Sequence, residues 1–383
     1  MAAVAPSFIR EILKVAGEPG TISFAGGLPD PRHFPVAALK AATLAVFDAE
    51  GATALQYGAS EGDLQLRQWI AAYYRQTQQL DISPAEILIT NGSQQALDLL
   101  GKVLVDEGDG VLIEEPGYLG ALQALSLYQP RFLPVPLQEE GPDLARLEHY
   151  LERARPKLFY TTPNFQNPSG LSYSYARRGD VAQLLGDHPT LLIEDDPYGD
   201  LRFCGKRPRS FKQLRPEHTV LLGSFSKTIA PSLRVGWLVA PAWLMKRLVI
   251  AKQAADLHTS GLNQRILVRY LQANDYAGHV RSIAAHYRQQ MEAMQQAIAR
   301  HFPAEVAITH PEGGMFLWAT LNTTTSARQL FERSIEKGVA FVPGHPFYVN
   351  RRDGNTLRLN FTNSDPAAIE RGIAAIGQAL REV

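Results

Sequence analysis

The sequence contains very little cysteine and no excess of charge of either sign. Cys204 is the only cysteine among 383 residues, so no disulfide can form within the chain, which is typical of a protein from a reducing compartment. Lys and Arg together number 38, and Asp and Glu together also number 38. Without net positive charge, a nucleic-acid or membrane-surface partner has no support. We therefore expect a cytoplasmic protein that binds neither nucleic acid nor membrane.

Several familiar sequence patterns are also missing. No apolar run is long enough to span a bilayer, and Arg10, Glu11 and Lys14 interrupt the apolar residues at the N-terminus, unlike the core of a signal peptide. None of the histidines forms an HExxH pattern, which argues against a zinc protease. Neither GxGxxG nor GxxxxGK[ST] occurs, so the fingerprints of dinucleotide and P-loop binding are absent.

The sequence does contain an alternation of short strand-like runs and helical stretches between about Thr53 and Ala240. The strand-like runs are Glu86–Thr90, Val111–Glu115, Leu158–Thr161, Leu191–Asp195, Val220–Gly223 and Val235–Ala240. This alternation predicts an α/β fold with a mostly parallel central sheet that helices cover on both faces. Polar residues follow the ends of these runs, where open α/β sheets bind their ligands.

The length of 383 residues favours a large and a small domain. The stretch Met245–Tyr287 reads as long helical sequence. Three later runs, Ala307–Thr309, Phe316–Thr320 and Leu357–Phe361, read as strands of a second, α+β domain. We expect residues 1–39 to pack with the small domain, residues 40–280 to form the large ligand-binding domain, and residues 281–383 to form the small domain.

One lysine stands in an unusual setting. Ser224, Ser226 and Lys227 follow the apolar run Thr219–Leu222, and Arg234 comes seven residues after the lysine. The hydroxyls and the guanidinium can hold a phosphate, while the amine can form a Schiff base with a neighbouring aldehyde. Pyridoxal phosphate carries both groups on one ring, and a lysine Schiff base is its usual attachment. The alternative is a solvated lysine on a polar loop.

Two loops can add polar groups to such a site. Ser93 and Gln94 stand between a strand and a helix, where the first helical amides can bind an anion; alternatively, Ser93 is an ordinary helix cap. The string Pro163–Gly170 has two prolines and a glycine, which predict a rigid turn. Asn167 in this turn can donate to a phenolate oxygen, although the segment can also be a plain turn.

A carboxylate of the acidic string Glu194–Asp196 can pair with a pyridine nitrogen. Its negative charge would keep that nitrogen protonated, because an opposite charge favours the charged form. Tyr198, three residues after Asp195, can bond the phenolic oxygen of the ring. The alternative is a divalent-metal site with oxygen ligands, for which the chain shows no accompanying phosphate loop. We expect no metal.

An aromatic residue and a lone cation complete the set of candidates. Tyr118 can stack on an aromatic cofactor ring or simply pack in the core. Arg358 interrupts an apolar strand-like run and requires an anionic partner if buried. That partner can be a substrate carboxylate or an internal acid, and the spacing does not decide between them.

These strings, taken in order, resemble the fold-type I, class I/II pyridoxal-phosphate aminotransferases. The matching strings are ISFAGGLPDPRHFP, ALQYGASEG, ILITNGSQQALDL, EEPGY, PNFQNPSG, EDDPY, GSFSKTIAPSLRVGW and NTLRLNF, and they extend from Ile22 to Phe361. Within the family, the strings SFIREILK and KQAADLHT are most similar to the 2-aminoadipate and kynurenine aminotransferase group. Ser169 stands where the family more often has threonine.

The resemblance implies a role for each candidate residue. Lys227 would bind the cofactor covalently, and Tyr118 would stack on its ring. Asp195 would pair with the ring nitrogen, and Asn167 and Tyr198 would bond the ring oxygen. The residues implied for the phosphate are Ser93, Gln94, Ser224, Ser226, Arg234 and, from the neighbouring subunit of a homodimer with shared sites, Tyr57. The residues implied for the substrate are Arg358 at the α-carboxylate, Gly27 and Asn167 close by, and Arg10 at a distal carboxylate.

The expected activity is therefore a ping-pong transfer of an amino group from an L-amino acid to 2-oxoglutarate. The donor would be 2-aminoadipate or a large apolar or aromatic amino acid. Three other kinds of function remain open. One is a β-lyase, racemase or decarboxylase on the same fold, because fold does not decide reaction type. Another is the effector-binding domain of an aminotransferase-like regulator. The third is a metal-dependent enzyme that uses Glu194–Asp196.

Overall fold

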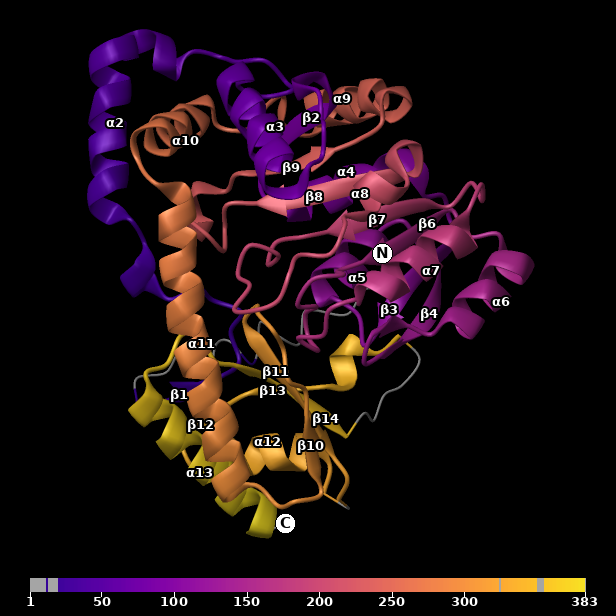
Figure 1. Cartoon of the computed structure of the whole chain (residues 1–383), viewed down its shortest axis with the longest axis vertical. Helices are drawn as coiled ribbons and strands as arrows, with labels where there is room; N and C mark the ends of the chain where they lie inside the picture. Colours follow the sequence, from indigo (N-terminus) through magenta and orange to yellow (C-terminus); the bar gives the residue numbers. More distant parts are fainter. Residues whose placement is uncertain (1–11, 13–19, 324, 350–354, 383) are drawn as a thin grey trace.

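The computed structural model describes residue 12 and residues 20–323, 325–349 and 355–382. A large eight-stranded sheet lies in the upper part of the view in Figure 1, and a four-stranded sheet lies in the lower part. The helices are α2 Val36–Glu50, α3 Leu64–Gln78, α4 Ser93–Leu104, α5 Leu119–Ser126, α6 Leu144–Ala154, α7 Tyr175–Leu185, α8 Phe211–Leu214, α9 Ala242–Asp256, α10 Gly261–Ala273, α11 Tyr276–His301, α12 Ala327–Glu336 and α13 Pro366–Glu382.

The large sheet has the strand order β2-β9-β8-β7-β6-β3-β4-β5. Its strands are β2 Ile87–Thr90, β3 Gly110–Glu115, β4 Arg131–Gln138, β5 Gly141–Pro142, β6 Leu158–Thr161, β7 Leu191–Asp195, β8 Thr219–Ser224 and β9 Gly236–Val239. The five central strands from β8 to β4 are parallel, while β9 and β5 run antiparallel to their neighbours. The prediction of a mostly parallel sheet is confirmed, and its parallel strands end at one edge.

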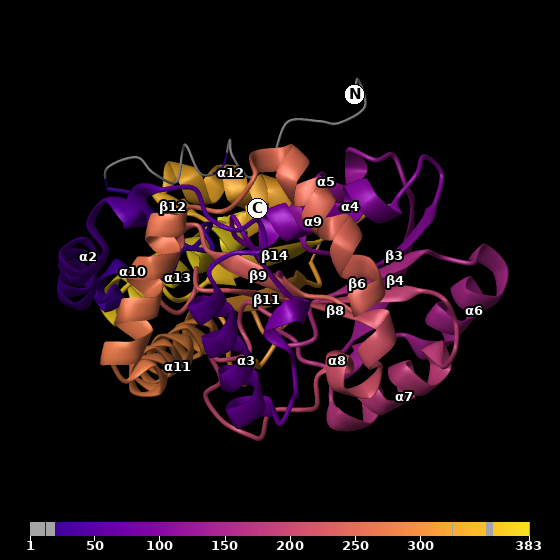
Figure 2. The same cartoon turned by 90° about the horizontal axis from the view of Figure 1, so that it is seen from above.

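Helices cover both faces of this sheet because successive strand residues point to opposite sides. In β3, Ile113 packs with α4, α5 and α9, whereas Leu112 packs with α6, α7 and α8. Figure 2 shows these two groups of helices on opposite sides of the strands. Capping side chains set several helix starts: Asp143 accepts from Arg146 N before α6, and Ser174 accepts from Arg177 N before α7.

The second unit combines a four-stranded antiparallel sheet with helices α12 and α13. Its strands are β10 Val306–Ile308, β11 Phe316–Leu321, β13 Val342–Pro343 and β14 Thr356–Asn360, in the order β10-β11-β14-β13. Near the N-terminus, β1 (Ile22–Ser23) pairs in parallel with β12 (Val339–Ala340), and Phe24 packs into the same core. Helix α11 runs from the large sheet to this unit in Figure 1. It spans about 39 Å over its 26 residues.

Some local expectations differ from the structure. The stretch expected as one long helical sequence is divided among α9, α10 and α11, and Ser260 and Asp275 cap the starts of the last two. Strand β4 was not expected, because Pro134 and Pro136 obscure its pattern. The expected domain boundary at residues 280 and 281 falls inside α11. Within the described residues, no helix is long and apolar enough to cross a membrane.

Candidate active site

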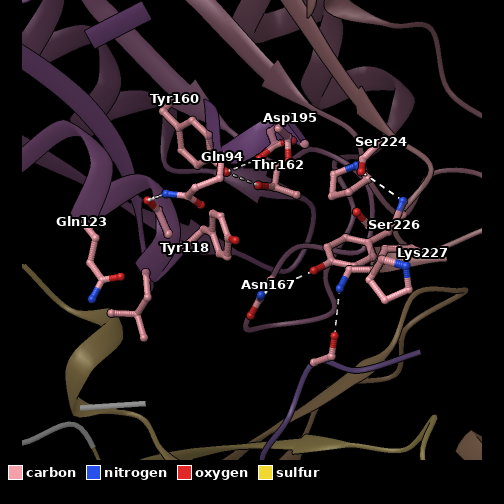
Figure 3. A pocket seen from close by; sticks show the side chains of 18 of the residues that line it. Gln94, Tyr118, Gln123, Tyr160, Thr162, Asn167, Asp195, Ser224, Ser226 and Lys227 are labelled. Atoms are coloured by element: carbon pink, nitrogen blue, oxygen red, sulfur yellow. Dashed lines mark hydrogen bonds between the residues drawn. The ribbon is translucent and has the colours of Figure 1, made fainter. Parts of the chain in front are cut away.

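A cavity of about 450 Å³ opens at the edge where β3, β6, β7 and β8 end. Its lining residues include Gly27, Ser93, Gln94, Tyr118, Asn167, Asp195, Tyr198, Ser224, Ser226, Lys227, Arg234 and Arg358. These are all the residues predicted for the site except Tyr57 and Arg10. They come from segments more than 300 residues apart in the sequence, and Figure 3 shows many of them around the cavity.

Lys227 follows β8 and carries its amine into the cavity. Its Nζ donates to the carbonyl oxygen of Gly27 at 2.8 Å, which is the dashed line at the bottom of Figure 3. Burial, followed by the positive charges of Arg358 and Arg234, lowers the pKa of Lys227 to about 8. Near neutral pH, a sizeable fraction of this lysine is thus a neutral amine, the form that attacks an aldehyde.

Asp195 is the last residue of β7 and is buried at the cavity wall. Its Oδ2 accepts from the Tyr160 hydroxyl at 2.7 Å, whereas its Oδ1 has no hydrogen-bond partner in the described part of the chain. Burial raises the pKa of Asp195 to about 7. Burial thus disfavours the ionised form of this acid, and a cationic donor that bonds to the bare Oδ1 would stabilise it.

The neighbouring acids are held differently. Asp196 accepts from Arg207 Nη2 at 2.6 Å and from Asn164 Nδ2 at 2.8 Å. Glu194 accepts from Ser210 Oγ, which is a short bond of 2.5 Å. The three acids of the string thus contact separate sets of donors and do not converge on one point, as ligands of a single metal ion would.

The opposite end of the cavity is suited to an anion. The backbone reverses at Gly92, whose φ is +74°, and helix α4 begins at Ser93 with its first amides free of helical partners. Gly92 rather than Ser93 is the N-cap, so the alternative interpretation of Ser93 as an ordinary helix cap is wrong. A Cβ at Gly92 would lie 2.6 Å from Arg234 Nη2. The close approach therefore places a guanidinium directly beside the helix start, a favourable place for a phosphate.

Three polar side chains meet on the remaining wall. Asn167 Nδ2 lies 3.5 Å from the Tyr198 hydroxyl, and Asn167 Oδ1 accepts from Arg358 Nη1 at 2.7 Å. Arg358 Nη2 donates to the Ala25 carbonyl at 2.6 Å, and its buried Nε has no partner within the described ranges. Burial lowers the pKa of Arg358 to about 10. No carboxylate among the described residues forms an ion pair with Arg358.

The structure also brings in residues that sequence reasoning missed. Tyr160 and Thr162 line the cavity, and the Tyr118 and Tyr160 rings stack with their centroids 6.5 Å apart. Tyr160 belongs to the strand-like run Leu158–Thr161, whose apolar pattern does not single it out. The signal was its hydroxyl, because a buried tyrosine usually requires a hydrogen-bond partner. Only the pairing of β6 with β7 identifies that partner as Asp195.

One predicted residue that the structure describes, Tyr57, does not line the cavity of the single chain. Tyr57 is 78% exposed, and its ring packs edge-on against His258 with the centroids 5.7 Å apart. Arg10 lies outside the described residues.

The cavity thus offers a lysine amine, a bare buried carboxylate oxygen and an anion cradle, which are the groups that pyridoxal phosphate requires. The family model of class I and II aminotransferases matches residues 24–376. This chain belongs to that family. The resemblance inferred from the sequence is confirmed, and so are the aminotransferase activity and the use of pyridoxal phosphate.

Similar proteins support this assignment. The 2-aminoadipate transaminase of Thermus thermophilus is 44% identical over 379 residues, which cover 98% of this aminotransferase and 94% of the relative. A solved α-aminoadipate aminotransferase from the same species, complexed with N-(5'-phosphopyridoxyl)-L-leucine, has a TM-score of 0.92 and 42% identity. The match covers 100% of this chain and 96% of that one. A kynurenine aminotransferase from Pyrococcus horikoshii, in complex with PMP, has a TM-score of 0.95 and 37% identity over 100% and 96% of the two chains.

Proposed function

We propose that this aminotransferase moves the amino group of 2-aminoadipate, or of a large apolar or aromatic L-amino acid, to 2-oxoglutarate, and that it works as a homodimer with shared sites. The single cysteine is consistent with a cytoplasmic location. The observation that carries the proposal is the meeting of Lys227 with Asp195 and Arg358 in one cavity. This arrangement supports the proposal, because an amine, a buried carboxylate and a guanidinium surround one substrate-sized space.

Each part of the cavity has a proposed task. Ser93, Gln94, Ser224, Ser226 and Arg234 would hold the phosphate. Asp195 would hold a proton on the ring nitrogen, and Tyr118 would stack on the ring. When bound, pyridoxal phosphate supplies the aldehyde and the ring that accepts electrons.

Lys227 would perform the proton transfer. Its Nζ would take the proton from the substrate Cα as a neutral amine and, as an ammonium, would return it to the cofactor carbon that carried the aldehyde. A pKa near 8 suits both directions at neutral pH, because neither form is rare. Asn167 and Tyr198 would bond the ring oxygen and fix the ring in the plane that this transfer requires.

Arg358 would bind the α-carboxylate that all donors share. Arg358 is 3% exposed and its hydrogen-bond partners within the described residues are neutral oxygens, so a buried positive charge remains without an acidic counter-charge there. A carboxylate would satisfy it through charge-assisted hydrogen bonds. Gly27 suits a close approach there, since a Cβ at this position would already lie 3.0 Å from Phe316 Cζ.

The choice of donor can be tested with a panel of amino acids and 2-oxoglutarate. We expect turnover of 2-aminoadipate and also of leucine and aromatic donors, in keeping with the ligands named for the similar proteins. Arg10 is proposed to pair with distal carboxylates. Replacing Arg10→Gln should raise KM for 2-aminoadipate and 2-oxoglutarate by about tenfold and leave leucine nearly unchanged. An equal effect on both classes would remove Arg10 from the specificity residues.

The shared-site dimer is supported by the open phosphate end. Gln94 and Arg234 are exposed in the single chain, and Tyr57 is exposed on a segment that packs beside α10. Tyr57 would reach the phosphate of the neighbouring subunit. Mixing Tyr57→Phe chains with Lys227→Ala chains should restore activity, because both defects fall in one site and the other site is intact. A hybrid no more active than its parents would contradict shared sites.

A further inference from the structure

Tyr160 and Asp195 face the same side of the large sheet from adjacent strands. Strands β6 and β7 are parallel, and Tyr160 stands opposite Ile193, so Asp195 lies two residues farther along on the same face. The Tyr160 hydroxyl donates to Asp195 Oδ2 at 2.7 Å, and both side chains are buried. Figure 3 shows the two side chains next to one another on the upper wall of the cavity.

Thr162 extends this contact into a short chain of hydrogen bonds. Its Oγ1 lies 3.3 Å from the Tyr160 oxygen. Tyr160 has one hydroxyl proton and donates it to Asp195, so Thr162 is the donor to Tyr160. Oδ2 of Asp195 thus has one donor, which Thr162 supports from behind, while Oδ1 is left bare and buried among the residues that the structure describes.

A second tyrosine makes an otherwise similar contact on the other face of the sheet. The Tyr173 hydroxyl donates to Glu114 at 2.6 Å, and both residues are buried. Glu114 also accepts from Thr161 Oγ1, Thr162 N and Gln166 Nε2, so both of its oxygens have partners. This pair packs among α6, α7 and α8, away from the cavity. Tyr173 is therefore the matched control for Tyr160: it is a buried tyrosine that donates to a buried acid but has a purely structural role.

We propose that Tyr160 is a positioning residue that presents Asp195 to the ring nitrogen of the cofactor. By occupying Oδ2, it leaves Oδ1 for the nitrogen and keeps the carboxylate ionised. The inference rests on the proposed function, because it takes Asp195 as the partner of the ring. It assigns to Tyr160 a role that none of the predicted site residues carries.

The proposal predicts the direction in which loss of the Tyr160 hydrogen bond changes the pH dependence of binding. A hydrogen bond to the ionised form of an acid favours that form, so Tyr160 holds the pKa of Asp195 below the value that burial alone would impose. Without this bond, Asp195 remains protonated to a higher pH. A protonated Asp195 must lose its proton before it can pair with a protonated ring, so affinity for the ring falls at neutral pH and recovers at alkaline pH.

Pyridoxamine phosphate is the probe, because it has no aldehyde and so reports the noncovalent site without Lys227. We would titrate it into the cofactor-free protein between pH 6 and pH 9 and compare wild type with Tyr160→Phe, Thr162→Val and Tyr173→Phe. For Tyr160→Phe, we expect the Kd near pH 7 to rise about tenfold and the acidic fall in affinity to move up by about one pH unit. Thr162→Val should shift the profile in the same direction by less. Ionisation of the probe itself is common to all four proteins and cancels in the comparison.

Tyr173→Phe should lower the unfolding temperature and leave the pH profile of binding unchanged. An unshifted profile for Tyr160→Phe, or equal shifts for the two tyrosine variants, overturns the proposal. If Tyr160→Phe does not fold, the Thr162→Val profile decides, and an unshifted profile there overturns the proposal too. If wild type does not bind pyridoxamine phosphate, the proposed function fails as well, which separates that outcome from failure of the Tyr160 role alone.

Discussion

Lysines inside and just outside the cavity are held in opposite ways. Lys252 in α9 is fully buried and donates to Gln95 Oε1 at 2.7 Å, to Asp256 Oδ1 at 2.7 Å and to Thr259 Oγ1 at 3.0 Å. Lys227 donates to a single backbone carbonyl. The first lysine thus has an acidic counter-charge, whereas the charges that act on the second are those of two arginines, Arg358 and Arg234.

Acids and arginines show the same contrast. Glu114 accepts from four donors, but Asp195 accepts from one and keeps a bare oxygen. Arg178 donates to Asn164 Oδ1 at 2.6 Å and lies 3.6 Å from Glu194. Arg358 has no such acid among the described residues.

The difference separates charges that stabilise the fold from charges that are available to ligands. A buried polar group without a partner costs free energy on folding, on the order of 1–3 kcal/mol. Most native buried groups therefore have partners, and the exceptions concentrate at functional sites. Among the described residues, two such atoms, Asp195 Oδ1 and Arg358 Nε, belong to residues that line this one cavity, whereas others, such as Gln290 Oε1, lie elsewhere.

The largest difference should separate the two lysines. Lys227→Ala should reduce transamination by at least about 10³-fold, because it removes both the covalent link and the proton-transfer base. Lys252→Met should retain activity but lose on the order of 3 kcal/mol of stability, because it leaves Asp256 without its buried partner. Steady-state kinetics and thermal unfolding measure the two effects. Comparable loss of activity in both variants would contradict the assignment of a catalytic role to Lys227 and a structural role to Lys252.

The two adjacent aspartates should differ next. Asp195→Asn should reduce kcat by about 10²–10³-fold, because the ring nitrogen loses its charged partner. Asp196→Asn should chiefly lower the unfolding temperature, since Arg207 loses a hydrogen-bonded counter-charge. Equal losses of kcat would mean that the strand register of these two side chains has been misassigned.

A smaller effect should follow from Arg358→Met. It should raise KM for leucine by about 10–100-fold through loss of a buried, charge-assisted contact. The matched substrate is isopentylamine, which is leucine without its carboxylate. The variant should lose discrimination between the two compounds. If wild type and variant discriminate equally, Arg358 does not bind the α-carboxylate.

The smallest expected effect concerns pH. Attachment of pyridoxal phosphate requires the neutral amine of Lys227, so its rate should rise with pH and level off above about 8. Arg358→Met removes a positive charge that lowers this pKa, so the midpoint should move to higher pH by less than about one unit. Stopped-flow absorbance of the bound cofactor reports the midpoint. A shift to lower pH would show that Arg358 does not act on Lys227 through its charge.

Much of the fold could be predicted because its signals are local. Strands β6 and β7 have the predicted bounds, since short apolar runs with β-branched and aromatic residues favour strands. The breaks between α9, α10 and α11 were missed because they contain no proline and because their caps, Ser260 and Asp275, resemble other surface polar residues. Strand β4 escaped because two prolines normally argue against an inner strand.

The same distinction applies to the candidate site: some of its residues can be predicted from local sequence, and others only from tertiary contacts. Asp195 ends strand β7 and Lys227 comes three residues after the end of β8, both in recognisable strings, so their place at the sheet edge could be predicted. The partners of Arg358 and the hydroxyl contact of Tyr160 depend on strand pairing and on contacts between segments far apart in sequence. Sequence patterns carry no information about which oxygen of Asp195 remains bare, because that depends on its three-dimensional neighbours.

The most direct test of the account is to reduce the pyridoxal-phosphate-loaded protein with borohydride and map the modified lysine by mass spectrometry. The account predicts one adduct, on Lys227, although Lys252 is more deeply buried. An adduct on Lys252, or one spread over several surface lysines, would contradict the claim that the partly satisfied charges of the cavity form the active site.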